Sequence, residues 1–168
     1  MKPHTAFLAG ALLLSACNPS AEQAAAPTNS ERMTALYDAF AAGDVEKVVA
    51  QMDPEIVWNE AENFIYADGN PYMGADAVVE GVFGRIGAEF DNFRLEETHF
   101  YGLDDDGVLV TGRYRGTFKA TGKQLDAQFA HVWKLKDTLV ASFQQYTDTW
   151  QAKEVTTPSG EMAEAEEQ

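Results

Sequence analysis

The stretch KQLDAQFAHVWKLK at residues 123–136 predicts a long β-strand, because its side chains alternate between a more aromatic and a more polar face. One face carries Ala127, Phe129, His131, Trp133 and Leu135. The other face carries Asp126, Gln128, Ala130, Val132 and Lys134. A histidine thus interrupts the more aromatic face, which makes His131 a candidate functional residue.

Three similar segments surround this strand. Strands are predicted at 93–103, 108–118 and 139–150. The connections at 104–107, 120–122 and 137–138 are short and rich in turn-forming residues. Short connections between consecutive strands predict an antiparallel meander.

The N-terminal half has helical periodicity instead. Ser30 can cap a first helix that Gly43 closes, and Asp44 can cap a shorter second helix that ends at Asp53-Pro54. A strand over 55–62, a long loop over 63–74 and a third helix over 75–90 follow. Helices followed by an antiparallel meander indicate an α+β fold, with the helices packed on one face of the sheet.

The first residues predict a targeting segment. Lys2 precedes a short apolar run that ends in Leu14-Ser15-Ala16-Cys17, and Cys17 is the one cysteine of the chain. This arrangement resembles the lipobox of bacterial lipoproteins, and Asn18 resembles the residue after the cysteine in the outer-membrane class. We therefore expect a signal peptide over 1–16 and a lipid anchor on Cys17 in the cell envelope. The alternative is an ordinary signal peptide that happens to end near a cysteine.

Composition limits the partners. The formal net charge of −15 opposes binding to nucleic acid or anionic lipid headgroups, so an uncharged and largely apolar small molecule is the easier partner. We expect a flexible linker over 17–29, one domain over 30–152, and an acidic, disordered tail over 153–168.

Three stretches carry a family resemblance: YDAFAAGD at 37–44, NPYMG at 70–74, and FAHVWKL at 129–135 with QYTD at 145–148. In this order they are similar to the SnoaL-like and nuclear transport factor 2-like superfamily, which includes ketosteroid isomerases and polyketide cyclases. The resemblance covers residues 30–150. It implies a cone in which three N-terminal helices pack on a strongly curved antiparallel sheet, cofactor-independent chemistry where there is any, and often a homodimer.

Glu60 and His131 are the candidate catalytic pair. Glu60 shares a strand face with Trp58 and resembles the proton-shuttling carboxylate of the isomerases, while His131 resembles the histidine of the cyclases. Desolvation would make Glu60 a better base, and an imidazole N–H could donate to an enolate oxygen. The alternatives are a solvated glutamate at a strand end and a core histidine satisfied by a neighbour.

The pocket of relatives lies inside the cone. The expected ligand-binding residues are Trp58, Phe64, Phe83, Phe129, Trp133, Tyr146 and Asp148. An uninterrupted register from a two-residue turn at 137–138 pairs His131 with Gln144, so Asp148 should lie about 13 Å from His131 at ~3.3 Å per residue. We therefore expect Asp148 at the pocket mouth. The oxyanion-binding tyrosine of the isomerases corresponds to Leu36, and Tyr37 is turned by ~100° from it.

Several functions remain open at this point. No metal site is predicted, because the histidines and the cysteine lack ligand spacing. The leading interpretation is an envelope lipoprotein that binds a small apolar molecule and moves a proton on it. A non-catalytic binding module, with the aromatic residues as core, is the second. The third is a structural dimer through the outer sheet face, with Arg113, Arg115, Val132 and Phe143.

Overall fold

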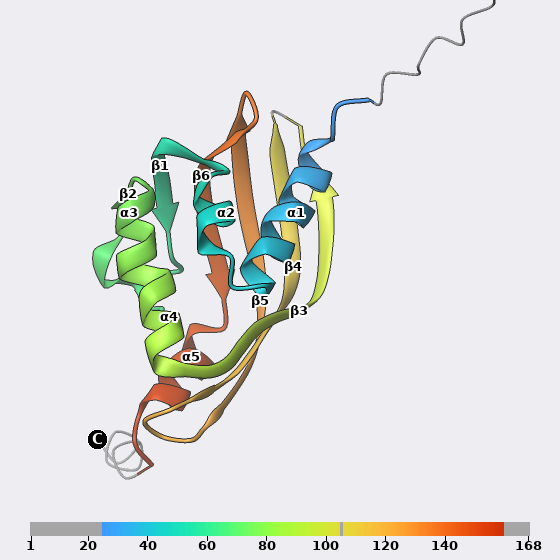
Figure 1. The fold of residues 1–168 in the computed structure, drawn as a ribbon. Coiled ribbons are helices and arrows are strands. Elements are labelled where there is room, and N and C mark those ends of the chain that lie inside the picture. The colour runs from blue at the N-terminus through green and yellow to red at the C-terminus, as the bar shows by residue number, and fades with distance from the viewer. Residues whose placement is uncertain (1–24, 105, 160–168) are drawn as a thin grey trace, which may run out of the picture.

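The computed structural model describes residues 25–104 and 106–159, so Cys17 and the predicted signal lie outside the described residues. Figure 1 shows a curved sheet with α1 to α4 on one face. The helical elements are α1 (Asn29–Ala41), α2 (Val45–Val49), the 3-10 turn η1 (Ala67–Gly69), α3 (Ala75–Val78), the π-helical η2 (Val79–Phe83), α4 (Gly84–Glu89) and α5 (Thr149–Thr156). The strands are β1 (Met52–Asn59), β2 (Tyr72–Met73), β3 (Phe90–Gly102), β4 (Gly107–Phe118), β5 (Gln124–Lys136) and β6 (Leu139–Thr147). Within the described ranges, no helix is long and apolar enough to cross a membrane.

The predicted meander is confirmed, and the sheet is larger than the meander. The strand order is β2-β1-β6-β5-β4-β3, with antiparallel pairing throughout β3 to β6. The expectation of a purely antiparallel sheet is wrong at one place, because β1 pairs with β6 in parallel. The connection from β1 to the meander runs through the helical segment at 75–89, which gives the chain room to return in the same direction.

The first two helices begin at side-chain caps. Thr28, rather than Ser30, caps α1, because the Thr28 hydroxyl accepts from the backbone N–H of Glu31 and the Glu31 carboxylate accepts from the backbone N–H of Thr28. Gly43 has the predicted left-handed conformation (φ +70°), and Asp44 caps α2 as predicted.

The third predicted helix is interrupted by a π-helical turn. Residues 75–89 form the run α3, η2 and α4, and Phe90 already begins β3. Gly81 lies in the π-helical turn, where a Cβ atom would come within 2.2 Å of the Tyr72 ring. The glycine therefore allows the loop before this run to pack closely against it.

A β-bulge changes the register between the last two strands. Leu135 pairs with Val140, but Lys134 pairs with Ser142, so Ala141 is the extra residue on β6. The sequence pattern had predicted an uninterrupted register. Nothing in the residues around Ala141 distinguishes a bulged strand from a regular one.

The bulge exchanges the faces of the rest of β6. His131 pairs with Gln145, where the uninterrupted register predicted Gln144. Because neighbouring side chains point to opposite faces, the one-residue shift turns each side chain over. Phe143 is therefore buried inside the cone, not on the outer face, and Tyr146 is 57% exposed on the outer face, not in the pocket.

The strand predicted to reach residue 150 ends earlier. β6 stops at Thr147, and the Asp148 carboxylate accepts from the backbone N–H of Gln151 at 3.0 Å, which caps α5. The predicted position of Asp148 at the pocket mouth is therefore wrong. Asp148 is exposed, and it is a capping residue on the outer side of the sheet.

The predicted start of the acidic tail at residue 153 is also wrong, because α5 continues to Thr156. Val155 is buried, and its carbonyl accepts from the Thr121 hydroxyl at 2.5 Å. Lys123 Nζ donates to the carbonyl of Glu154 at 3.0 Å. The end of β6 is thus followed by a docked helix, and the residues from 160 onward lie outside the described part.

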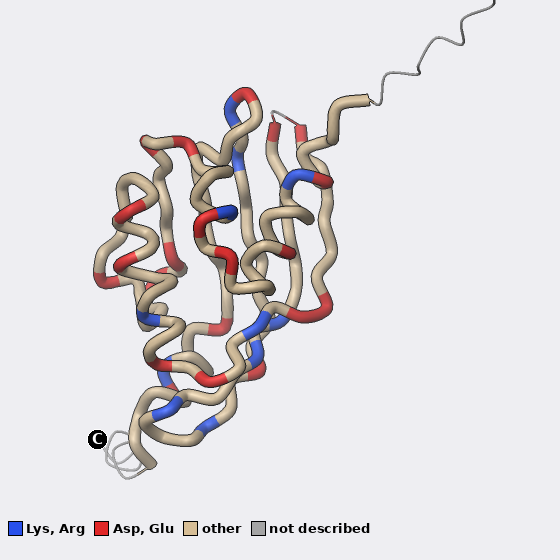
Figure 2. Tube along the Cα trace, viewed as in Figure 1, with Lys and Arg blue, Asp and Glu red and all other residues tan. Residues whose placement is uncertain are grey.

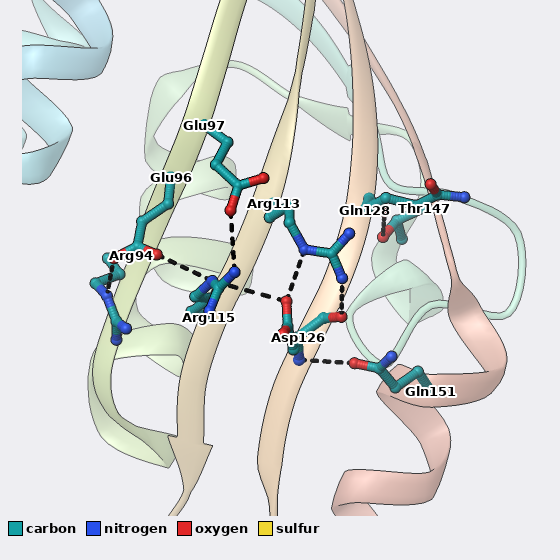
Figure 3. A network of polar contacts seen from close by, with 9 residues as sticks. All are labelled: Arg94, Glu96, Glu97, Arg113, Arg115, Asp126, Gln128, Thr147 and Gln151. Atoms are coloured by element: carbon teal, nitrogen blue, oxygen red, sulfur yellow. Dashed lines mark hydrogen bonds and ion pairs between the residues drawn. The ribbon is translucent and has the colours of Figure 1, made fainter.

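The outer face of β3, β4 and β5 carries a network of ion pairs (Figure 3). Arg115 Nε lies 2.9 Å from Glu96, and Arg113 Nε lies 2.7 Å from Asp126. Figure 2 shows that many of the basic positions lie in the lower part of the view, near α4 and α5. Both arginines of the predicted dimer face are thus paired within the chain, and the dimer stays a prediction.

We predict that Val155→Ala lowers the free energy of unfolding by about 1–3 kcal/mol, because it removes buried methyl groups that join α5 to the core. Lys153→Ala is the matched control, since Lys153 is exposed on the same helix and should change stability by no more than ~0.5 kcal/mol. Urea unfolding measures both. Equal, small effects of the two substitutions would show that α5 is not docked.

Candidate functional site

The cone encloses a mostly apolar cavity with a free volume of about 60 Å³. Every layer of the fold contributes to its walls. Its lining consists of Leu36, Tyr37, Phe40, Val48, Trp58, Glu60, Phe64, Val82, Phe83, Ile86, Phe93, Leu95, Tyr114, His131, Trp133, Phe143 and Gln145. The polar groups therefore sit in a predominantly aromatic environment, where burial and hydrogen bonding decide their ionisation.

Glu60 directly follows the end of β1 and is 2% exposed. The Trp58 indole Nε1 donates to Glu60 Oε1 at 2.6 Å, whereas Oε2 has no hydrogen-bond partner within residues 25–104 and 106–159. The side-chain amide of Asn70 bonds to both the N–H and the carbonyl of Glu60, at 2.9 and 2.8 Å, and so fixes the backbone that carries this carboxyl. Burial raises the pKa of Glu60 to about 7, against the opposing effects of Trp58 and Gln145.

His131 lies at the centre of the inner face of β5. Its Nδ1 is hydrogen-bonded to the hydroxyl of Tyr37 at 2.5 Å, and its Nε2 is hydrogen-bonded to the hydroxyl of Tyr114. The ring stacks on Phe129, with centroids 4.1 Å apart. Burial lowers the pKa of His131 to about 3, so the imidazole is neutral at physiological pH.

The hydrogen bonds around the neutral imidazole leave one hydroxyl proton to spare. A neutral imidazole has one acceptor nitrogen, so only one of Tyr37 and Tyr114 can donate to His131, and the other accepts from it. The Trp133 indole also donates to the Tyr37 hydroxyl, at 3.2 Å, and the Gln145 amide donates to the Tyr114 hydroxyl, at 2.9 Å. The tyrosine that accepts from His131 therefore keeps its own proton for another acceptor.

The loop after β1 closes one side of the cavity. Phe64 of this loop is buried and lines the cavity. Arg85 of α4 holds the loop, since its guanidinium lies 2.7 Å from Asp68 Oδ1 and donates to the carbonyl of Ile65 at 3.1 Å. The predicted loop at 63–74 thus contributes to the wall, although it also contains η1 and β2.

Comparisons with solved structures find the same fold in several proteins. An NTF2-like protein from Burkholderia thailandensis is 33% identical, covering 79% of this chain and 100% of that chain, with a TM-score of 0.71. A candidate polyketide cyclase from Pseudomonas putida is 15% identical, covering 77% and 98%, with a TM-score of 0.67. A protein with a ketosteroid isomerase-like fold from Catenulispora acidiphila, solved with trimethylamine, is 19% identical, covering 69% and 84%, with a TM-score of 0.58.

The family model described as "SnoaL-like domain" matches residues 33–143. The chain belongs to the SnoaL-like family. This confirms the family that the three sequence stretches predicted, and the α+β architecture with it. A search of the curated proteins found no match.

The cavity of this SnoaL-like protein contains most of the residues predicted to lie in it. Both candidate catalytic residues line the cavity, together with Trp58, Phe64, Phe83 and Trp133. Phe129 is buried behind His131 and supports the ring without lining the cavity. Tyr146 and Asp148 lie outside the cavity, because the bulge turns Tyr146 to the outer face and Asp148 caps α5. Among the described residues, no group of side chains could hold a metal ion.

Sequence reasoning missed three polar residues of the cavity. Tyr37 was expected to be turned by ~100° from the position of the isomerase tyrosine, but it and Leu36 both line the cavity, because the cavity spans more than the 100° between successive helical residues. Tyr114 was recognisable from the two-residue alternation of the sequence, which places it on the same face of β4 as Val108 and Val110. Gln145 was hidden by the bulge in β6.

We predict a pH-dependent loss of stability caused by Glu60. The pKa of Glu60 is raised in the folded protein, so the unfolded chain releases this proton first as the pH rises. The contribution of Glu60 to stability should therefore fall between about pH 4.5 and 7, by on the order of 3 kcal/mol. Urea unfolding across this pH range should show that loss in the natural protein and not in Glu60→Gln.

The matched control for this series is Glu62→Gln. Glu62 is exposed and lies two residues away, so its replacement should leave the pH profile of the natural protein unchanged. A constant difference between the natural protein and Glu60→Gln from pH 4.5 to 7 would contradict a raised pKa of Glu60.

Proposed function

We propose that this SnoaL-like protein binds a small, largely apolar, carbonyl-bearing molecule in the cavity, and that Glu60 moves a proton on it. One observation carries the proposal. The unpartnered Oε2 of Glu60 and a tyrosine hydroxyl with a spare proton belong to the same mostly apolar cavity. A buried polar atom without a partner costs free energy, so its place in a cavity favours a role toward a ligand.

The chemical step needs no further reactant. The Glu60 carboxylate takes a proton from the carbon next to the carbonyl, and the carbonyl oxygen gains the negative charge of an enolate. The spare hydroxyl of Tyr37 or Tyr114 donates to that oxygen. Glu60 then returns the proton to the same or another carbon, which regenerates the carboxylate.

His131 has a different role in this proposal from the one expected from the sequence. Both of its ring nitrogens are already hydrogen-bonded to tyrosines, so the tyrosine hydroxyl, not the imidazole, is the donor to the enolate. His131 is a positioning residue that holds Tyr37 and Tyr114 and, being neutral, leaves their protons in place.

A non-catalytic binding module is the second candidate. The free volume of about 60 Å³ is smaller than the ~300–1,000 Å³ of common ligand pockets, which favours a packed aromatic interior over a substrate site. In that case the aromatic side chains mainly form the core, and Glu60 is a buried acid that stays protonated.

The proton-transfer proposal predicts that the protein catalyses exchange of the α-protons of cyclohexanone in D₂O, followed by NMR. Glu60→Gln should reduce this exchange by ~10²–10⁴-fold, the usual contribution of a general base. Tyr37→Phe and Tyr114→Phe should each reduce it less, because either change still leaves one hydroxyl at His131.

The exposed neighbour Glu62 supplies the control, since Glu62→Gln should exchange protons at the natural rate. Equal exchange with the natural protein and with Glu60→Gln would rule out Glu60 as the base. Exchange no faster than in buffer would favour the binding module.

We also propose that lipid on Cys17 anchors the protein in the cell envelope, facing the periplasm from the outer membrane. The support is the lipobox-like run before this cysteine. Cys17→Ala should therefore move the protein out of the membrane fraction or leave an uncleaved precursor. A mature form that remains with the membranes after this substitution would refute the lipid anchor.

A further inference from the structure

We propose that the same cavity also accepts a small methylated ammonium ion, with Glu60 as its counter-ion and the aromatic rings as its walls. The inference rests on the ligand-binding part of the proposed function and not on proton transfer. A methylated ammonium has a positive charge but an apolar surface, and the cavity offers the complement of both.

The one ionisable group of the cavity that can carry a charge near neutral pH is acidic. Among the residues that the structure describes, no lysine or arginine lines it, and Glu60 is its one acidic side chain. With only the Trp58 indole donating to it, a Glu60 carboxylate leaves Oε2 without a hydrogen bond and without a counter-ion. A buried carboxylate without a partner costs free energy. A cation that enters the cavity would supply the counter-ion that the lining residues do not provide.

The walls consist of aromatic rings that pack edge to face at nearly right angles. Trp58 meets Phe83 at 86° and Trp133 at 79°, with ring centroids 5.5 Å apart in both pairs. Adjacent walls at nearly right angles surround a compact, roughly spherical group better than a flat one. Aromatic faces attract cations through the ring quadrupole, and desolvation strengthens this attraction.

The groups around Glu60 remain uncharged near neutral pH. Tyr37 of α1, Tyr66 of the loop, Tyr114 of β4 and His131 of β5 are the titratable groups that face this region. Burial raises the pKa of the three tyrosines and lowers the pKa of the histidine. Cation binding should therefore compete with protonation of Glu60 alone and should tighten from pH 6 to 8.

The test compares choline with 3,3-dimethylbutan-1-ol. The two molecules have the same shape, but a carbon atom of the alcohol replaces the charged nitrogen of choline. Titration calorimetry at pH 8 should give at least tenfold tighter binding of choline. Glu60→Gln should make choline and the alcohol bind equally tightly, with the affinity for the alcohol unchanged. Glu62→Gln should preserve the tighter binding of choline. Circular dichroism establishes that each variant is folded.

A second variant keeps the test independent of Glu60. Phe83→Leu replaces a half-buried aromatic wall by an aliphatic one, so it should weaken choline binding at least threefold and leave the alcohol nearly unchanged. Binding of the alcohol as tightly as choline would overturn the cation site and still support a neutral ligand. Binding of neither probe would also overturn the cation site, whereas the cyclohexanone exchange separately decides the proton transfer.

Discussion

The burial of one carboxyl group in an aromatic cavity constrains the rest of this site. Glu60 lies where β1 ends, and the Asn70 amide holds its backbone through two hydrogen bonds. Its side chain receives a single donor, the Trp58 indole, so the protein satisfies one oxygen and leaves the other free. A fully hydrogen-bonded carboxylate would be stable as an anion and inert, whereas this one favours its neutral form and changes state easily.

The other polar side chains of the cavity add no second charge. Tyr37, His131 and Tyr114 form a hydrogen-bonded row across three elements, and the indole of Trp133 and the amide of Gln145 complete it. Because the imidazole is neutral, the row contains donors and acceptors but no cation that would pair with Glu60. The Glu60 carboxyl and the tyrosine hydroxyls can then act on a ligand in the cavity without first breaking an ion pair.

Much of this fold was predictable from local patterns, whereas some side-chain placements were not. The alternation in β5 placed His131 and Trp133 on one face, and Gly43 with Asp44 marked the joint between α1 and α2. The register of β6 depends on a bulge at Ala141, and the residues around it do not predict a bulge. That single residue exchanged the faces of Gln145 and Tyr146, so a site prediction based on uninterrupted alternation failed there. The helix α5 was missed for a similar reason, because its burial depends on contacts with Thr121 and Lys123 far along the chain.

The titration of the Glu60 carboxyl carbon by ¹³C NMR tests the central claim most directly, because it needs no ligand and no activity. Comparison with Glu60→Gln assigns the signal. The structure predicts a pKa of about 7 for Glu60, since burial among aromatic side chains disfavours its charged form. A pKa at or below the ~4.3 of an ordinary glutamate would mean a solvated or ion-paired group, and would contradict both the burial of Glu60 and its proposed role as the base.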